Sequence, residues 1–184
     1  MFKKMKGFTL IEILIACAIF SILILSVFRV ISVGSSSWFI GDASVALRQE
    51  VIKTFMRLER ELRQTRPSQI NLAFGTSATS LTFKVPQDNN ADGTILDSSG
   101  NIEWSTNIVY ALNNTSHQIT RTASNVTSII ANDVTGLRFS RNFTSILANV
   151  SLANILQVDI NVSKTTPTGR QLKDKGQIQM EMRN

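Results

Sequence analysis

The sequence is poor in the residues that build disulfides, zinc sites and catalytic triads. Its single cysteine, Cys17, lies inside an apolar run, so no disulfide can hold together a domain outside that run. Its single histidine, His117, has no Cys or His companion, which excludes zinc sites of the usual spacing. No G-x-S-x-G motif is present, and His117 lies in the polar run NNTSHQ, which is typical of a hairpin tip. We therefore expect a protein that is not an enzyme.

Positive charge is also scarcer than the composition suggests. The chain has 19 basic and 13 acidic side chains, a formal charge of +6. Lys3, Lys4 and Lys6 belong to a basic leader, and a cut after Gly7 leaves 16 basic against 13 acidic side chains, or +3. The remaining excess lies in one predicted helix, at 48–66, where acids alternate with the bases, as on a solvated helix face. Nucleic acid is therefore not an expected partner.

The longest feature that is present is an apolar segment over residues 8–28, in which Glu12 is the only charge. As a helix it would span about 31 Å, close to the thickness of the hydrocarbon core. The preceding lysines put the N-terminus in the cytoplasm and everything after Val33 on the far side of the membrane. A secretory signal would have its small-residue cleavage site after the apolar run, whereas Gly7 comes before it. The segment is therefore expected to stay on the mature chain.

Glu12 needs a partner, because a carboxylate at mid-bilayer costs on the order of 2.5 to 3.5 kcal/mol. Cleavage after Gly7 would free the amine of Phe8, one helical turn from Glu12. That amine can neutralise Glu12 of the same chain or of a neighbouring subunit. The alternative is an acid near the interface that is protonated or that reaches the headgroups.

The string KMKGFTLIEILIA, residues 4–16, resembles the processing signal of type IV pilins and of the pseudopilins of type II secretion. The resemblance implies that a prepilin peptidase cuts between Gly7 and Phe8 and methylates the new amine. It also implies a bacterial inner-membrane protein with a single span and a periplasmic C-terminal domain. Its expected partners are other minor and major pilins or pseudopilins and the inner-membrane assembly platform, with Phe8 and Glu12 acting in assembly. Unlike many filament-forming pilins, this chain has Arg29 and no proline late in the apolar helix.

After the span, Gly34 and three serines predict a bend or loosened turn. A second helical stretch follows over about 42–65, and Pro67 ends it. Its apolar residues recur at steps of four, four, three and four, which is one stripe of an amphipathic helix. This stripe is expected to pack on the protein's own sheet. Contact of part of the stripe with neighbouring subunits is the alternative. The stripe consists of Leu47, Val51, Phe55, Leu58 and Leu62.

From residue 68 onward, short alternating runs separated by polar turns predict half-buried strands at 80–85, 107–112, 118–122, 136–141, 155–162 and 177–182. The expected fold class is α+β, with a long N-terminal helix packed on antiparallel sheets in a pilin-like arrangement. The expected organisation is a leader at 1–7, a membrane and assembly helix at 8–33, an exit bend and stalk helix at 34–66, and a β-rich domain at 67–184.

The segments ELRQTRP, IVYAL, ITRT and DVTGLRFSRN resemble minor subunits of the pseudopilin J type and their pilus counterparts of the PilW type. The resemblance implies a structural subunit that primes or caps a type II secretion pseudopilus or a type IV pilus. The alternative is a binding module at the filament tip, an adhesin or a DNA-uptake subunit.

The loop at 88–100, DNNADGTILDSSG, holds a candidate calcium site. Asp88, Asn90, Asp92 and Gly93 match the first half of a calcium loop, in which alternating oxygen side chains surround a hard cation. The second half does not match, because position twelve is Ser99 instead of a bidentate glutamate. A polar turn between two strands would have the same residue types, so both interpretations stay open. No other cofactor is expected.

Overall fold

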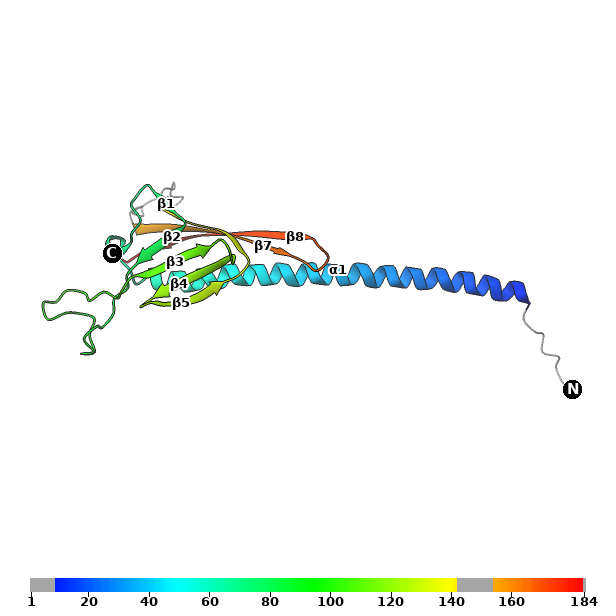
Figure 1. The fold of residues 1–184 in the computed structure, drawn as a ribbon, viewed down its shortest axis with the longest axis horizontal. Coiled ribbons are helices and arrows are strands. Elements are labelled where there is room, and N and C mark those ends of the chain that lie inside the picture. The colour runs from blue at the N-terminus through cyan, green and yellow to red at the C-terminus, as the bar shows by residue number, and fades with distance from the viewer. Residues whose placement is uncertain (1–8, 142–153, 184) are drawn as a thin grey trace. The chain divides into compact units, whose positions relative to one another are not determined.

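A computed structural model describes residues 9–141 and 154–183 of the chain. These residues form one long helix, one short 3₁₀ turn and eight strands (Figure 1). The chain divides into two compact units, Met1–Asp42 and Ala43–Asn184. The first unit is helical where it is described, and the second holds the end of the helix and all the strands. The α+β class predicted from the sequence is confirmed.

Helix α1 spans Leu10–Leu62 and belongs to both units. In the second unit its buried residues recur every three or four positions, so one stripe faces the interior. The predicted stripe is confirmed with one adjustment: Thr54 is buried and Phe55 is half-buried against the core. The hydroxyl of Thr54 donates to the carbonyl of Glu50 at 2.8 Å, which removes the cost of burying it. The buried residues of the helix are Ala43, Leu47, Val51, Thr54, Leu58 and Leu62.

The helix differs from its sequence prediction at two places. It continues through residues 34–37, where a bend or loosened turn is predicted. A glycine costs only about 1 kcal/mol in a helix, and the Ser36 hydroxyl donates to the Ser32 carbonyl at 3.0 Å without breaking the ladder. The helix also ends at Leu62 instead of residue 65, and Pro67 opens the 3₁₀ turn η1, Pro67–Gln69.

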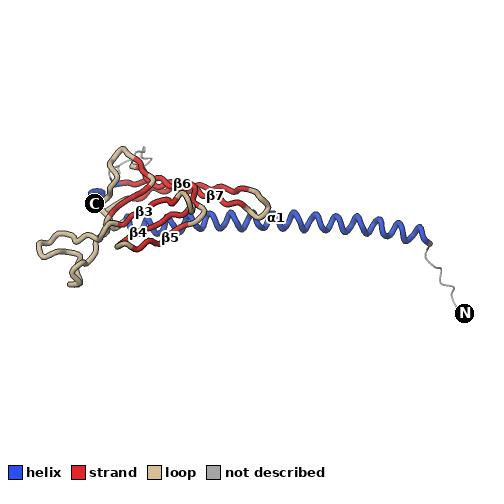
Figure 2. The backbone as a smooth tube through the Cα atoms, viewed as in Figure 1, coloured by secondary structure: helices blue, strands red, loops and turns tan. Residues whose placement is uncertain are grey.

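The strands form two antiparallel sheets of four (Figure 2). One sheet has the order β2-β3-β4-β5 and the other the order β1-β6-β7-β8. All six predicted strands are present, and the structure adds β1 and β5. The bounds are β1 Ser77–Ala78, β2 Ser80–Phe83, β3 Ile108–Asn113, β4 Gln118–Ala123, β5 Val126–Ala131, β6 Val134–Ser140, β7 Ile155–Thr165 and β8 Gln171–Glu181.

The core of the second unit lies between its helical segment and both sheets. Leu58 and Leu62 of α1 are fully buried, together with Tyr110 of β3 and Val158 of β7. On β8, a Cβ built at Gly176 would come within 2.3 Å of Val51 Cγ1, so glycine is what lets this strand approach the helix.

A charged cluster fixes the other sheet to the same helix. Glu61 accepts a hydrogen bond from the Tyr110 hydroxyl at 3.1 Å and pairs with Arg121 of β4 at 3.0 Å. Arg57, one turn before Glu61, lies 3.8 Å from the same carboxylate. Both sheets therefore have a defined position on the second half of α1.

Candidate functional site

The predicted processing residues Gly7 and Phe8 lie outside the described residues. The structure describes the chain from Thr9, which immediately precedes α1. The cleavage site and the methylated amine therefore stay predictions from the sequence.

Glu12 lies in the first turn of α1, where it forms a reciprocal cap with Thr9. The backbone N–H and the hydroxyl of Thr9 each donate to Glu12 Oε2 at 2.9 Å. The N–H of Glu12 in turn donates to Thr9 Oγ1 at 3.4 Å. This is a capping box, in which the N-cap threonine and the glutamate three residues later satisfy each other's free amides. The T-x-x-E motif at 9–12 is a known signal for a capping box, which the prediction from the sequence did not include.

The cap leaves part of Glu12 available. Both hydrogen bonds from Thr9 go to Oε2, and Oε1 has no partner among the described residues. A carboxylate oxygen can accept further donors, so one atom of Glu12 can receive a cation from outside the chain segment that the structure describes.

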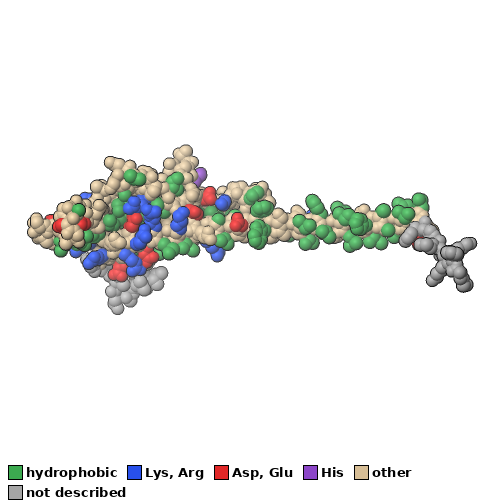
Figure 3. Space-filling view, turned by 90° about the horizontal axis from the view of Figure 1, so that it is seen from below, with side chains coloured by type: hydrophobic (Ala, Val, Ile, Leu, Met, Phe, Trp, Pro, Cys, Tyr) green, Lys and Arg blue, Asp and Glu red, His purple; other side chains and the backbone are tan. Residues whose placement is uncertain are grey.

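The helix in the first unit exposes its apolar residues. An 18-residue window of α1 has a mean hydropathy of 2.8, and none of it is buried. By length and composition this helix is able to cross a membrane. Two of its serines are satisfied within the helix, since Ser21 donates to the Cys17 carbonyl and Ser26 to the Ile22 carbonyl, both at 2.8 Å. Figure 3 shows hydrophobic side chains exposed along this part of the helix.

One face of this helix is hollowed between its aromatic side chains. The hollow has a volume of about 300 Å³. The residues that line it recur at three- and four-residue spacing, so they share one face of α1. They are Phe20, Leu23, Ile24, Val27, Phe28 and Ile31.

The candidate calcium residues lie in the long loop between β2 and β3 (Figure 2). Asp88 accepts from the N–H groups of Ala91 and Gly93 at 2.7 and 2.9 Å. Asp92 Oδ1 accepts from the N–H and hydroxyl of Thr94, both at 2.8 Å. The Asn90 amide donates to Asp92 Oδ2 at 3.0 Å. These oxygens organise the turn, and the calcium site stays a prediction.

Hydrogen bonding also sets the acidity of this loop. The bonds from the Thr94 side chain and backbone lower the pKa of Asp92 below its ordinary value. The N–H of Asn101 does the same for the pKa of Asp97. No group of three His, Cys, Asp or Glu side chains suited to a metal occurs within 9–141 and 154–183. His117 lies at the tip between β3 and β4 with a φ of 53°, which agrees with the predicted hairpin.

Residues 2–28 match the model of the prokaryotic N-terminal methylation motif. Comparisons with curated proteins and with solved structures found no match. The motif covers Gly7, Phe8 and Glu12 and continues through the exposed apolar helix. Together, the motif and the helix indicate an N-terminal segment of the type IV pilin kind, which is able to anchor the chain in a membrane and implies a prepilin peptidase as partner.

Proposed function

We propose that the chain is a minor pilin or pseudopilin, a structural subunit that primes or caps a type II secretion pseudopilus or a type IV pilus. The observation that carries this proposal is the methylation motif, continuous with an apolar helix whose one charge in residues 8–28 is Glu12. A pilin-like chain has a structural role, so we propose no enzymatic activity for it.

The exposed helix supports this function because it has the surface of a packing element. The apolar side chains on the face from Phe20 to Ile31 are exposed and do not pack against other described residues of their own unit. In lipid, helices associate through van der Waals packing and through hydrogen bonds between polar side chains. A hollowed apolar face with one acid near its start is suited to a neighbouring helix of the same kind.

Glu12 supplies the specific bond in this assembly. Oε1 of Glu12, which has no partner among the described residues, is available to the methylated amine of Phe8 in a neighbouring subunit, while Thr9 keeps Oε2. Pairing would neutralise two charges that are each costly in a low-dielectric environment. This bond forms only when the neighbour is in register, so it selects the correct stagger between helices.

The test is the replacement Glu12→Ala in the organism's own filament system. We expect the variant to be inserted and cleaved as before and to be absent from the sheared filament or pseudopilus fraction. Cleavage is followed by the mobility shift on loss of the leader. Normal incorporation of Glu12→Ala would contradict the proposed pairing.

Thr9→Val is the matched control, because it removes the hydroxyl of the cap while keeping the carboxylate of Glu12. If Glu12 acts by pairing with a neighbour, this variant should still assemble. If it acts only as a helix cap, Thr9→Val should also reduce incorporation, because it removes both cap bonds that involve the Thr9 hydroxyl and leaves only the bond from the Thr9 backbone N–H.

A further inference from the structure

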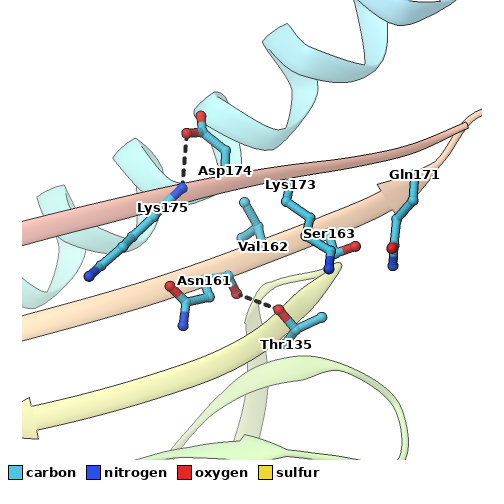
Figure 4. A pocket seen from close by; sticks show the side chains of 8 residues that line it. All are labelled: Thr135, Asn161, Val162, Ser163, Gln171, Lys173, Asp174 and Lys175. Atoms are coloured by element: carbon cyan, nitrogen blue, oxygen red, sulfur yellow. Dashed lines mark hydrogen bonds between the residues drawn. The ribbon is translucent and has the colours of Figure 1, made fainter.

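A hollow of about 490 Å³ lies on the second unit, where strands β6, β7 and β8 run side by side (Figure 4). We call it the lysine pocket, because Lys173 and Lys175 are its free cations. Its lining is polar except for one valine, and comprises Thr135, Asn161, Val162, Ser163, Gln171, Lys173, Asp174 and Lys175.

The positive charge of the lysine pocket is not compensated within the part of the chain that the structure describes. Lys173 and Lys175 are exposed and form no ion pair there. Two nearby acids are already paired, Asp174 with Arg48 at 3.4 Å and Asp133 with Lys164 at 3.7 Å. Asp159, two residues before Asn161 on β7, accepts a hydrogen bond from the Gln157 amide at 3.1 Å. In Figure 4 the Asp174 side chain points towards α1, on the other side of β8 from the two lysines. The pocket therefore offers two cations to a ligand.

Neutral donors lie beside each lysine. The antiparallel register of β7 and β8 places Ser163 opposite Lys173 and Asn161 opposite Lys175. Gly136 of β6 lies opposite Asn161, and a Cβ there would come within 2.9 Å of its Nδ2. A side chain at position 136 would therefore crowd the Asn161 amide. The result is a row of amide, hydroxyl and ammonium donors on one face.

The spacing of the lysines indicates the kind of anion. Residues two apart on a strand are separated by roughly 6.5–7 Å, so the two ammonium groups can meet two separate monoanions. The lining contains no arginine, whose planar fork is the usual group for bidentate binding of a single phosphate. The pocket is better suited to carboxylates carried on one polypeptide segment.

The same unit carries such a segment. The loop between β2 and β3, which we call the acidic loop, contains Asp88, Asp92, Asp97 and Glu103, with no Lys or Arg between residues 85 and 107. None of its four acids forms an ion pair with a described residue, and each accepts hydrogen bonds from amides or hydroxyls of the loop itself. These bonds pre-order the carboxylates, which reduces the entropy lost on binding.

The acidic loop cannot reach the pocket of its own molecule. The pocket lies beside Arg48, which pairs with Asp174, whereas the loop leaves the domain beside Thr65, whose hydroxyl bonds the Lys84 carbonyl. The helix from Arg48 to its end at Leu62 alone covers about 21 Å. Figure 1 shows the β7–β8 hairpin tip and the acidic loop at opposite ends of the domain. Figure 3 shows acidic side chains at the loop end.

We propose that the lysine pocket binds the acidic loop of a second copy of this chain, head to tail. Uncompensated lysines at one end and uncompensated carboxylates at the other make the two ends of the domain complementary. A contact between two different surfaces is heterologous, so it leaves a free pocket and a free loop at the ends of every stack. The inference rests on the proposed function, in which the chain is a filament subunit, and it adds that a second copy of the chain is one of its neighbours.

The test uses the purified full-length chain in detergent, with self-association measured by sedimentation at low and high salt. Lys173→Glu with Lys175→Glu should weaken association by at least about tenfold, since it removes two ion pairs and adds repulsion. Asp92→Lys with Asp97→Lys should do the same. A one-to-one mixture of the two charge-reversed proteins should associate again, because each supplies the surface that the other has lost.

Several controls keep this result specific. Every variant retains residues 9–42, so association through the apolar helix is common to all of them. Arg60→Glu with Arg66→Glu makes the same change in net charge as the lysine pair, at exposed positions outside the pocket, and should leave association unchanged. Asp92→Asn with Asp97→Asn removes charge while keeping polar side chains in the loop, and should also weaken association. This pair covers the case in which the lysine substitutions disturb the loop fold.

A chain whose association is insensitive to salt and to all these changes would overturn the proposal. Dependence on the lysines without dependence on the acidic loop would also overturn it, since another anion would then be the ligand. Neither result affects the proposed function, which is decided separately by incorporation of Glu12→Ala.

Discussion

The two halves of helix α1 have opposite relations to the rest of the molecule. Before residue 42 its large apolar side chains are exposed, as at Ile24, which is 53% exposed. After residue 43 the helix buries a stripe, and Leu58 is 0% exposed. One continuous element therefore obeys two constraints. The second half is matched to its own sheets, whereas the first half is exposed and apolar enough to cross a membrane.

The largest expected difference between the two halves of the helix is found by truncating one large apolar side chain in each half. Leu58→Ala should lower the free energy of unfolding of the domain by about 2–5 kcal/mol, because it leaves a cavity in the core. Ile24→Ala should leave that free energy unchanged. Chemical denaturation of the full chain in detergent, followed by tryptophan and tyrosine signals, measures both. Equal losses would show that the first half also contributes to the domain core.

Replacing one glycine by alanine in each unit should change stability in opposite directions. Gly176→Ala should cost about 1–3 kcal/mol, since its Cβ would lie 2.3 Å from Val51 Cγ1 and 2.8 Å from the Phe55 ring. Gly34→Ala meets nothing within 4 Å and should stabilise the helix by up to about 1 kcal/mol. Denaturation reports the first change, and thermal loss of helical circular dichroism reports the second. A neutral Gly176→Ala would mean that the strand and helix separate freely.

The smallest expected effect concerns the cluster that joins β3 to the second half of the helix. Tyr110→Phe removes the hydrogen bond to Glu61 and should cost about 0.5–1.5 kcal/mol at neutral pH. Burial, and then the charge of Glu61, raise the pKa of Tyr110 above its ordinary value of 10.0.

The pH dependence of this effect has a definite sign. Above pH 10 the unfolded chain releases the phenol proton while the folded chain keeps it, so the parent protein loses stability as pH rises. The variant lacks this loss, which amounts to at most about 1.4 kcal/mol per pH unit. Denaturation from about pH 8 to about pH 11 should show the parent's advantage shrinking. A constant difference across that range would contradict the buried phenol.

The sequence predicted the parts of the fold that repeat a simple period. The stripe from Leu47 to Leu62 and the alternation in β7 were visible because each side chain pattern matches one geometry. Strand β5 was missed because a bulge between Ile119 and Thr120 disturbs its pairing with β4, so that the adjacent residues Ile130 and Ala131 are both buried. The start of β8 was missed because charged residues alternate there with half-buried ones.

The candidate sites divide in the same way. Glu12 was recognisable because its whole motif is contiguous, although its cap with Thr9 was overlooked. The lysine pocket was not visible in the sequence, because Asn161 and Lys175 come together only when β7 pairs with β8. Local spacing predicts contacts within one element, whereas a surface assembled from three strands depends on register.

The cap between Thr9 and Glu12 affects how stable a single chain is in the membrane before it contacts any neighbour. A carboxylate that holds two hydrogen bonds from its own chain is less exposed to the surrounding hydrocarbon than a bare one. Under the proposed function, a newly inserted chain can therefore stay singly in the bilayer until a neighbouring amine reaches Glu12, because its own cap already satisfies part of the carboxylate.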